Sequence, residues 1–173
     1  MATSIYCMEN KTNTYNREAE FQNIVERYSL LITKVCYYFT TDLAEFKDLR
    51  QDVLINIWTG IERIKNTGSP TTWIYRVCFN TCISYWRKNC KQKNKVPVSQ
   101  ILELPDDPGI DMAKYNEMHR LINRLNPSDK AIILMWLDES TYEEIAEVVG
   151  VNRNTIATRI KRIKEKLVKL SNQ

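Results

Sequence analysis

Apolar residues return every three or four positions along most of this chain, which is the spacing that places them on one face of an α-helix. One such series runs through residues 17–39, and a second runs through residues 46–64, where apolar side chains recur at steps of four. A third series covers residues 73–88. Alternation of apolar and polar residues, the mark of a half-buried β-strand, never extends beyond a few positions. The pattern therefore predicts three long helices in the first half of the chain.

The helical pattern stops at residues 91–111 and then resumes. This stretch holds three of the five prolines and has charged residues at both ends, as is typical of a linker between domains. Beyond it, the spacing predicts helices at residues 112–125, 128–137, 141–149 and 153–170. We therefore predict an all-α chain of two small helical domains joined by a flexible linker, the first at residues 17–90 and the second at residues 112–173. Residues 1–16 are polar and unpatterned, so we expect a flexible N-terminus there.

The most specific local pattern begins at Thr141. With Glu144 three residues later, Thr141 forms a capping box, which starts a helix. Gly150 allows the left-handed backbone that ends this helix, and Asn152 can cap the next one. That next helix carries one apolar stripe, formed by Ile156, Ile160, Ile163, Leu167 and Leu170. These features predict a helix-turn-helix, whose second helix enters the major groove of duplex DNA.

The other faces of that second helix are polar and basic. Arginine can bond to guanine edges and asparagine to adenine edges, whereas threonine and lysine can hold phosphates. The N-terminus of a helix also favours a phosphate. We predict that the DNA contacts of the helix-turn-helix are Asn152, Arg153, Asn154, Thr155, Ala157, Thr158, Lys161 and Arg162.

The helix predicted at residues 73–88 has three different faces on a helical wheel. The broad apolar face, expected to pack in the core, is formed by Ile74, Val77, Cys78, Thr81, Cys82 and Tyr85. The polar face is formed by Arg76, Asn80, Ser84, Arg87 and Lys91, and the third by Tyr75, Phe79, Ile83 and Trp86. Cations beside aromatic rings suit unpaired nucleic acid, because rings stack on exposed bases while cations hold phosphates. Aromatic residues at helical spacing also pack into cores, so both interpretations stay open.

Charge and cysteine content narrow the functional classes. Residues 87–95 carry five cations and no acid, residues 153–169 are also strongly basic, and acids gather at residues 103–111. Two separated basic clusters suggest two contacts with a polyanion. Five cysteines without a recognisable secretion signal predict reduced thiols and a cytoplasmic protein. No apolar run approaches the roughly 18 residues that cross a bilayer, so we expect no membrane insertion.

Cys78 and Cys82 lie four residues apart, which raises the question of a zinc site. Cys90 and His119 could supply the other two ligands of a tetrahedral site. However, both cysteines of the pair fall on the apolar face of their helix, and His119 lies beyond the linker. We therefore favour small buried thiols and predict neither a metal site nor a cofactor.

Two long segments resemble parts of one bacterial family. The segment DLRQDVLINIW…SPTTWIYRVCFNTCISYWRK resembles the second region of extracytoplasmic-function (ECF) sigma factors, and the segment INRLNPSDKAIILMWLDESTYEEIAEVVGVNRNTIATRIKRIKEKL resembles their fourth region. The order of the segments, the linker and the chain length also fit, so the resemblance covers nearly the whole chain. It implies a non-enzymatic protein that binds core RNA polymerase, recognises the −35 and −10 promoter elements and helps to melt the promoter.

The resemblance also implies roles for individual residues. Contacts with the β′ clamp helices of polymerase would be made by Asp48, Leu49, Gln51, Asp52 and Asn56. The −10 element would be opened and held by Lys65, Asn66, Trp73, Arg76, Asn80, Trp86, Arg87 and Lys88. The second domain would bind the −35 element through its helix-turn-helix and would meet the β flap of polymerase. Many family members are held inactive by an anti-sigma factor, which is a further candidate partner.

Two positions depart from the family pattern. Ser84 stands where many members have aspartate, and Arg153-Asn154 replaces a commoner acidic-glycine or serine pair, so an unusual promoter sequence is expected. The main alternative is a helix-turn-helix regulator that binds duplex DNA without polymerase; it would need neither the docking helix nor the basic-aromatic helix of the first domain. A nucleic-acid enzyme fits less well, because no acidic metal-binding cluster accompanies the basic helices.

Overall fold

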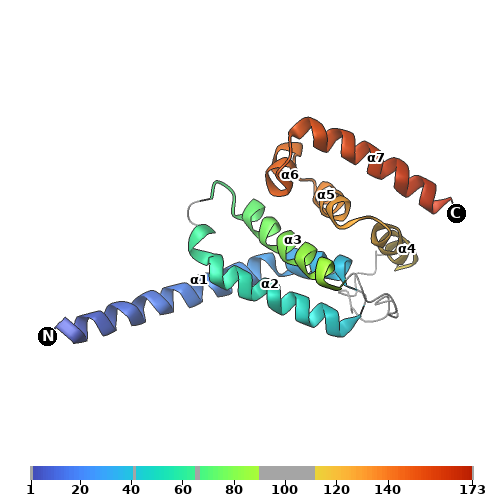
Figure 1. Cartoon of the computed structure of the whole chain (residues 1–173). Helices are drawn as coiled ribbons and strands as arrows, with labels where there is room; N and C mark the ends of the chain where they lie inside the picture. The colour runs from blue at the N-terminus through green and yellow to red at the C-terminus, as the bar shows by residue number, and fades with distance from the viewer. Residues whose placement is uncertain (1, 41, 65–66, 90–111, 173) are drawn as a thin grey trace.

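The computed structural model describes residues 2–40, 42–64, 67–89 and 112–172, and every regular element in these ranges is an α-helix (Figure 1). The elements are α1 (Ala2–Phe39), α2 (Leu43–Ile64), α3 (Pro70–Asn89), α4 (Met112–Asn123), α5 (Pro127–Leu137), α6 (Tyr142–Val149) and α7 (Arg153–Ser171). The all-α prediction is confirmed, whereas the predicted linker lies outside the described residues. None of the described helices combines the length and apolarity needed to cross a bilayer.

Helices α1–α3 form the first domain, whose core follows from the spacing of apolar residues on α2. Leu49, Val53, Ile57 and Ile61 succeed one another at steps of four, and all four are fully buried. A stripe of this kind leaves water only when other helices pack against it. Here α1 and α3 both pack against α2, so the three helices share one core.

Helix α1 begins earlier than the apolar pattern predicts. Nη2 of Arg17 donates to the backbone oxygen of Trp58 at 2.8 Å, which ties α1 to α2. The helix continues back to Ala2 and projects beyond the other helices in Figure 1. The apolar pattern did not predict this helical backbone before Arg17, whereas the flexibility expected at residues 1–16 stays a prediction. A physical reason is that adding residues to an existing helix avoids the unfavourable nucleation step.

Helices α4–α7 form the second domain, which contains each local signal of the helix-turn-helix. Thr141 Oγ1 accepts a hydrogen bond from the backbone nitrogen of Glu144 at 3.2 Å, and the Glu144 carboxylate accepts one from the backbone nitrogen of Thr141 at 2.8 Å. Gly150 adopts the left-handed conformation, with φ of 74° and ψ of 35°. The side chain of Asn152 caps α7 by accepting from the backbone nitrogen of Asn154. Helices α6 and α7 therefore form the predicted helix-turn-helix.

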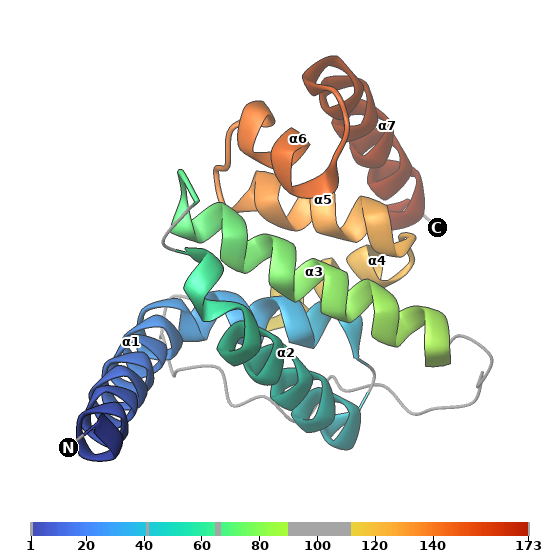
Figure 2. The same cartoon turned by 60° about the vertical axis from the view of Figure 1, so that its left-hand side comes forward.

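The two domains pack against each other. Helices α5 and α6 lie against α3, and helices α4 and α5 lie against α1 (Figure 2). The buried apolar residues of both domains form one continuous hydrophobic cluster. The first helix of the helix-turn-helix is therefore in direct contact with the basic-aromatic helix of the first domain.

Candidate nucleic-acid interface

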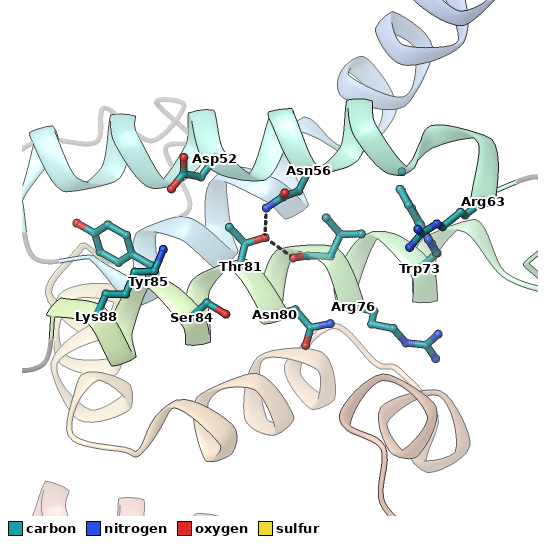
Figure 3. A pocket seen from close by; sticks show the side chains of 12 residues that line it. Asp52, Asn56, Arg63, Trp73, Arg76, Asn80, Thr81, Ser84, Tyr85 and Lys88 are labelled. Carbon is teal, nitrogen blue, oxygen red and sulfur yellow. Dashed lines mark hydrogen bonds between the residues drawn. The ribbon is translucent and has the colours of Figure 1, made fainter.

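A groove of about 600 Å³ runs between α2 and α3 (Figure 3). It brings together residues that were predicted for two roles, because Asp52 and Asn56 come from α2 while Trp73, Arg76 and Asn80 come from α3. The other lining residues are Gly60, Arg63, Val77, Thr81, Ser84, Tyr85 and Lys88. Residues expected to contact polymerase and residues expected to contact the −10 element therefore share one surface.

Two contacts set the spacing of α2 and α3 along this groove. Asn56 Nδ2 donates to Thr81 Oγ1 at 2.9 Å, and that hydroxyl donates to the backbone oxygen of Val77 at 2.8 Å. Farther along, Gly60 permits a close approach to the Trp73 ring: a Cβ atom at residue 60 would lie 2.9 Å from Cζ2 of Trp73. The Trp73 ring is consequently buried against α2 while it lines the groove.

The structure separates the predicted −10 residues by exposure. The exposed members are Asn80, Trp86, Arg87 and Lys88. Trp73 is buried, and Arg76 is half-buried because its Nη2 donates to the backbone oxygen of Glu147 at 3.0 Å and to the Glu147 carboxylate at 3.2 Å. Lys65 and Asn66 lie outside the described residues.

Tyr75 and Phe79 belong to the core rather than to the open surface. Their exposed fractions are 4% and 2%, and their rings stack with centroids 5.7 Å apart and planes inclined by 8°. The ring of Phe39 lies 6.1 Å from that of Phe79. Burial raises the pKa of Tyr75, and the hydrogen bond that its hydroxyl donates to Asp138 raises it further. Among the aromatic residues on this face of α3, Trp86 is the exposed one and is available to stack on a base.

The outer face of α2 carries the predicted polymerase contacts with one exception. The exposed members are Asp48, Gln51, Asp52 and Asn56. Leu49 is fully buried in the core of the first domain, so its side chain cannot reach a partner. Ile55 is 52% exposed and was not among the predicted contacts. Its position seven residues after Asp48 places it on the same helical face, and that spacing is the signal that could have identified it.

Helix α7 presents its predicted DNA contacts to solvent. All of them are exposed except Ala157, which is half-buried. Arg153 is held at the start of the helix, because its Nε donates to the Glu143 carboxylate and its guanidinium carbon lies 5.7 Å from the centre of the Tyr142 ring. The hydrogen bond from Arg153 lowers the pKa of Glu143. Arg153 is therefore oriented before any DNA is bound.

One cation of the basic cluster on α7 has a structural role instead. Nη2 of Arg159 bonds to Oδ1 of Asp129 at 2.7 Å, and both side chains are largely shielded from solvent. The pair ties α7 to α5 inside the second domain. Arg159 therefore contributes to holding the helix-turn-helix together.

A second hollow, of about 430 Å³, lies in the second domain and is lined mainly by apolar side chains of α4, α5 and α7. Met118, Leu137 and Val168 are exposed around it. Nζ of Lys164 lies 3.6 Å from the centre of the Trp136 ring in the same hollow. The sequence analysis missed this surface because three helices distant in sequence assemble it.

Three cysteines of the first domain lie in its core. Cys36, Cys78 and Cys82 are fully buried, and burial raises the pKa of the Cys78 and Cys82 thiols well above the ordinary value. Within the part of the chain that the structure describes, no group of three or more His, Cys, Asp or Glu side chains is arranged to hold a metal ion. Cys90 lies outside that part. His119, on α4 of the second domain, packs against Tyr37 of α1, with ring centres 4.1 Å apart.

Comparisons with known proteins match both halves of the chain. The sigma-70 region 2 family model matches residues 24–92, and the sigma-70 region 4 model matches residues 115–167. The chain is 26% identical over 163 residues to the ECF RNA polymerase sigma factor SigW of Bacillus subtilis, an alignment that covers 86% of this chain and 87% of SigW. It is 24% identical over 162 residues to the RNA polymerase sigma factor YlaC of the same organism, covering 86% of this chain and 90% of YlaC.

Two solved structures share the fold. The sigma factor RpoE from Bartonella quintana, in complex with the anti-sigma factor NepR, gives a TM-score of 0.70 at 19% identity, covering 88% of this chain and 96% of that chain. CnrH in complex with the cytosolic domain of CnrY gives a TM-score of 0.64 at 17% identity, covering 88% of this chain and 87% of that chain. At these identities the likeness concerns the fold alone.

Proposed function

This chain belongs to the ECF sigma factors of the sigma-70 family, and we propose that it engages core RNA polymerase and promoter DNA through three surfaces. Proteins of this family bind core polymerase and start transcription at promoters, and they are generally non-enzymatic initiation factors. The three surfaces are the outer face of α2, the exposed edge of α3 and the recognition helix α7. The observation that carries the proposal is the groove between α2 and α3, where the first two of these surfaces meet.

The edge of α3 suits the unpaired strand of the −10 element. Asn80, Arg87 and Lys88 are exposed beside Trp86, so cations and a stacking ring lie on one helix. Stacking contributes roughly 1–3 kcal/mol per base. Arg63 lines the groove as an additional cation that the sequence analysis did not select. Because these contacts favour an unpaired strand over a duplex, they shift the promoter toward its open form without any chemical step.

The outer face of α2 suits a protein partner. Ile55 is an exposed apolar side chain with Asp48, Gln51 and Asn56 around it. An apolar centre with a polar rim is the usual anatomy of a protein interface. We assign this face to the β′ clamp helices of polymerase, with Ile55 taking the apolar role that the buried Leu49 cannot take.

The second domain offers one surface to DNA and another to polymerase. Arg153 and its exposed neighbours on α7 suit the major groove of a duplex −35 element, and Arg153 is already oriented by Glu143. The apolar hollow formed by α4, α5 and α7 suits an amphipathic segment of a partner. We assign this hollow to the β flap of polymerase, and an anti-sigma factor is a competing partner for it.

The test is in vitro transcription with purified core polymerase over a library of genomic DNA. We expect specific transcripts that depend on this protein. The variant Arg87→Ala is expected to reduce promoter opening, measured by permanganate reactivity of unpaired thymines, while polymerase binding is retained. Arg124→Ala removes an exposed cation between α4 and α5 and serves as the matched control. An absence of both core binding and specific transcripts would contradict the proposal, and would instead favour a regulator that binds duplex DNA without polymerase.

A further inference from the structure

We propose that Glu143 of α6 is a positioning residue that holds Arg153 of α7 as the reader of one guanine in the −35 duplex. The base sequence that is recognised then depends on a residue outside the recognition helix. The inference rests on the proposed binding of duplex DNA by α7, and it names the base that this helix selects. It follows from the donors of Arg153 that stay free, from the charge of Glu143 and from the packing beneath the pair.

Arg153 lies at the point of the helix-turn-helix that meets base edges. It is the first residue of α7, and its side chain is exposed. Figure 2 shows the start of α7 at the end of the second domain that faces away from α1–α3. The N-terminal residues of a recognition helix contact base edges in the major groove. Arg153 is also a position at which the chain departs from the family pattern, so its contact with DNA is expected to be particular to this chain.

The contact with Glu143 leaves the outer fork of the Arg153 guanidinium free. Nε of Arg153 donates to the Glu143 carboxylate, and within the described residues no hydrogen bond engages Nη1 or Nη2. These two nitrogens form a planar fork that can donate to two acceptors at once. Guanine presents two acceptors side by side in the major groove, O6 and N7, whereas adenine, thymine and cytosine each present at most one. The free fork of Arg153 therefore matches guanine.

The charge of Glu143 favours a base over a phosphate as the partner of Arg153. A phosphate also accepts from both Nη groups, but it carries a full negative charge and would lie close to the Glu143 carboxylate. The edge of guanine has no net charge, so the carboxylate repels it less. Lys161 and Arg162 on the same helix are exposed and have no acidic partner among the described residues, which suits them to phosphates. The pair with Glu143 therefore distinguishes Arg153 from the other cations of α7.

The pair rests on an ordered helix start. Tyr142, which precedes Glu143 on α6, is half-buried and packs against the core. The guanidinium carbon of Arg153 lies 5.7 Å from the centre of the Tyr142 ring, so the ring bounds the guanidinium on one side. Glu143 lies in the first turn of α6, which the capping box of Thr141 and Glu144 fixes. Two side chains from the start of α6 therefore hold the fork of Arg153.

The pair contributes little to the stability of the fold. The Arg153 and Glu143 side chains are 56% and 63% exposed, and exposed ion pairs contribute little to folding stability. Holding a long side chain in place before binding instead removes part of the entropy that binding costs. Glu143→Gln is therefore expected to change DNA recognition without unfolding the second domain.

The experiment selects duplexes from a library that contains one randomised segment, using the full-length protein assembled with core polymerase. We expect the wild type to enrich guanine at one position. Replacing that guanine by adenine should weaken binding about 5- to 150-fold, measured by fluorescence anisotropy at fixed salt. Arg153→Lys keeps the charge but loses the planar fork, so the preference for guanine should disappear at this position alone.

Glu143→Gln separates positioning from charge. Removal of a negative charge beside DNA strengthens binding to every duplex, whereas loss of positioning lowers the preference for guanine over adenine, here by about 2- to 12-fold. A second measurement uses 7-deazaguanine, which lacks N7, at the selected position. This base should weaken binding of the wild type more than binding of Glu143→Gln. In a protein that already carries Arg153→Lys, Glu143→Gln should not change the preference further.

Glu165→Gln, on the exposed face of α7, is the matched control because it removes the same charge without touching the pair. Its preference for guanine should equal that of the wild type, and circular dichroism should show that all variants stay helical. An unchanged preference in Glu143→Gln would overturn the positioning role. An enriched sequence in which no guanine responds to Arg153→Lys would overturn the assignment of the base and leave the proposed −35 function standing. If the wild type enriches no sequence, the proposed −35 function fails as well.

Discussion

Helix α7 presents its proposed DNA contacts to solvent, whereas the proposed contacts of α3 lie next to a side that packs against α5 and α6 of the other domain. The surface proposed to read duplex DNA is formed within one local unit: Thr141, Gly150 and Asn152 shape the turn, and Glu143 orients Arg153. The strand-holding surface is not complete by itself, because its aromatic side is packed against protein. The comparison teaches that duplex recognition here depends on local structure, while strand capture depends on how the domains are arranged.

The substitution Arg153→Ala tests the proposed recognition of duplex DNA by α7. A side chain that reads a base directly contributes about 1–3 kcal/mol, so we expect the affinity for a −35 duplex to fall about 5- to 150-fold. Binding of single-stranded DNA should be unaffected. The measurement is fluorescence anisotropy at one fixed salt concentration, because phosphate contacts make affinity fall steeply with ionic strength.

Lys169→Ala, near the C-terminal end of α7, is the control for lost positive charge. An equal loss for Arg153→Ala on a duplex of random sequence would mean that Arg153 holds a phosphate rather than reading a base.

The sequence alone predicted the α7 surface in more detail than the α3 surface. The capping box of Thr141 and Glu144, the left-handed Gly150 and the cap at Asn152 all act between residues a few positions apart. Because these signals involve residues close together in the sequence, the helix-turn-helix could be predicted residue by residue. The all-α class and the positions of most helix ends followed from apolar spacing for the same reason.

The α3 surface could not be resolved in the same way. A helical wheel placed Tyr75 and Phe79 on a distinct strip but could not say what covers that strip, because the covering helices begin after the linker. Leu49 and Ile55 show the same limit on α2. Both lie on α2, but the packing of α1 and α3 decides that Leu49 is buried and Ile55 is exposed. The Asp138 carboxylate accepts hydrogen bonds from Tyr75 and Lys34, which lie 63 and 104 positions away in the sequence. No pattern of neighbouring residues predicts contacts of this kind.

The substitution Gly60→Ala tests the proposed binding of single-stranded DNA along the groove between α2 and α3. The new methyl group would meet the rigid Trp73 ring at 2.9 Å, so α2 and α3 must separate slightly. Overpacking of this kind typically costs about 1–3 kcal/mol, and we expect a loss near the lower end for a single methyl group. Chemical denaturation should show the lower stability, and strand binding should weaken while binding of the −35 duplex stays the same.

Gly68→Ala is the matched control for this substitution. Nothing lies within 4 Å of a Cβ atom at residue 68, so the added methyl group meets open space. Equal effects of the two substitutions would show that the close approach of Gly60 to Trp73 does not shape the groove.

The smallest expected effect is a pH dependence of the packing between the two domains, and it arises from His119. Burial lowers the pKa of His119, and the charge of Lys130 on α5 lowers it further. The ring stacks on Tyr37 and Tyr38 of α1, so separation of the domains would expose it and return its pKa toward the usual value of about 6.5. With the domains separated, the protein then binds more protons below that pH. The packed arrangement of the domains therefore loses stability as the pH falls through this range. Lys130 stays charged in both forms there, since its pKa is about 8.

We therefore expect the radius of gyration to increase when the pH is lowered from about 7.5 to about 5.5, the interval in which histidine changes charge. His119→Gln keeps a polar side chain that does not titrate, and it should remove most of the response. Because α7 does not form this joint, the affinity of Arg153 and its neighbours for duplex DNA should follow the same pH course in both proteins. A full response retained by His119→Gln would assign the pH dependence to another group and leave His119 as a packing residue between the domains.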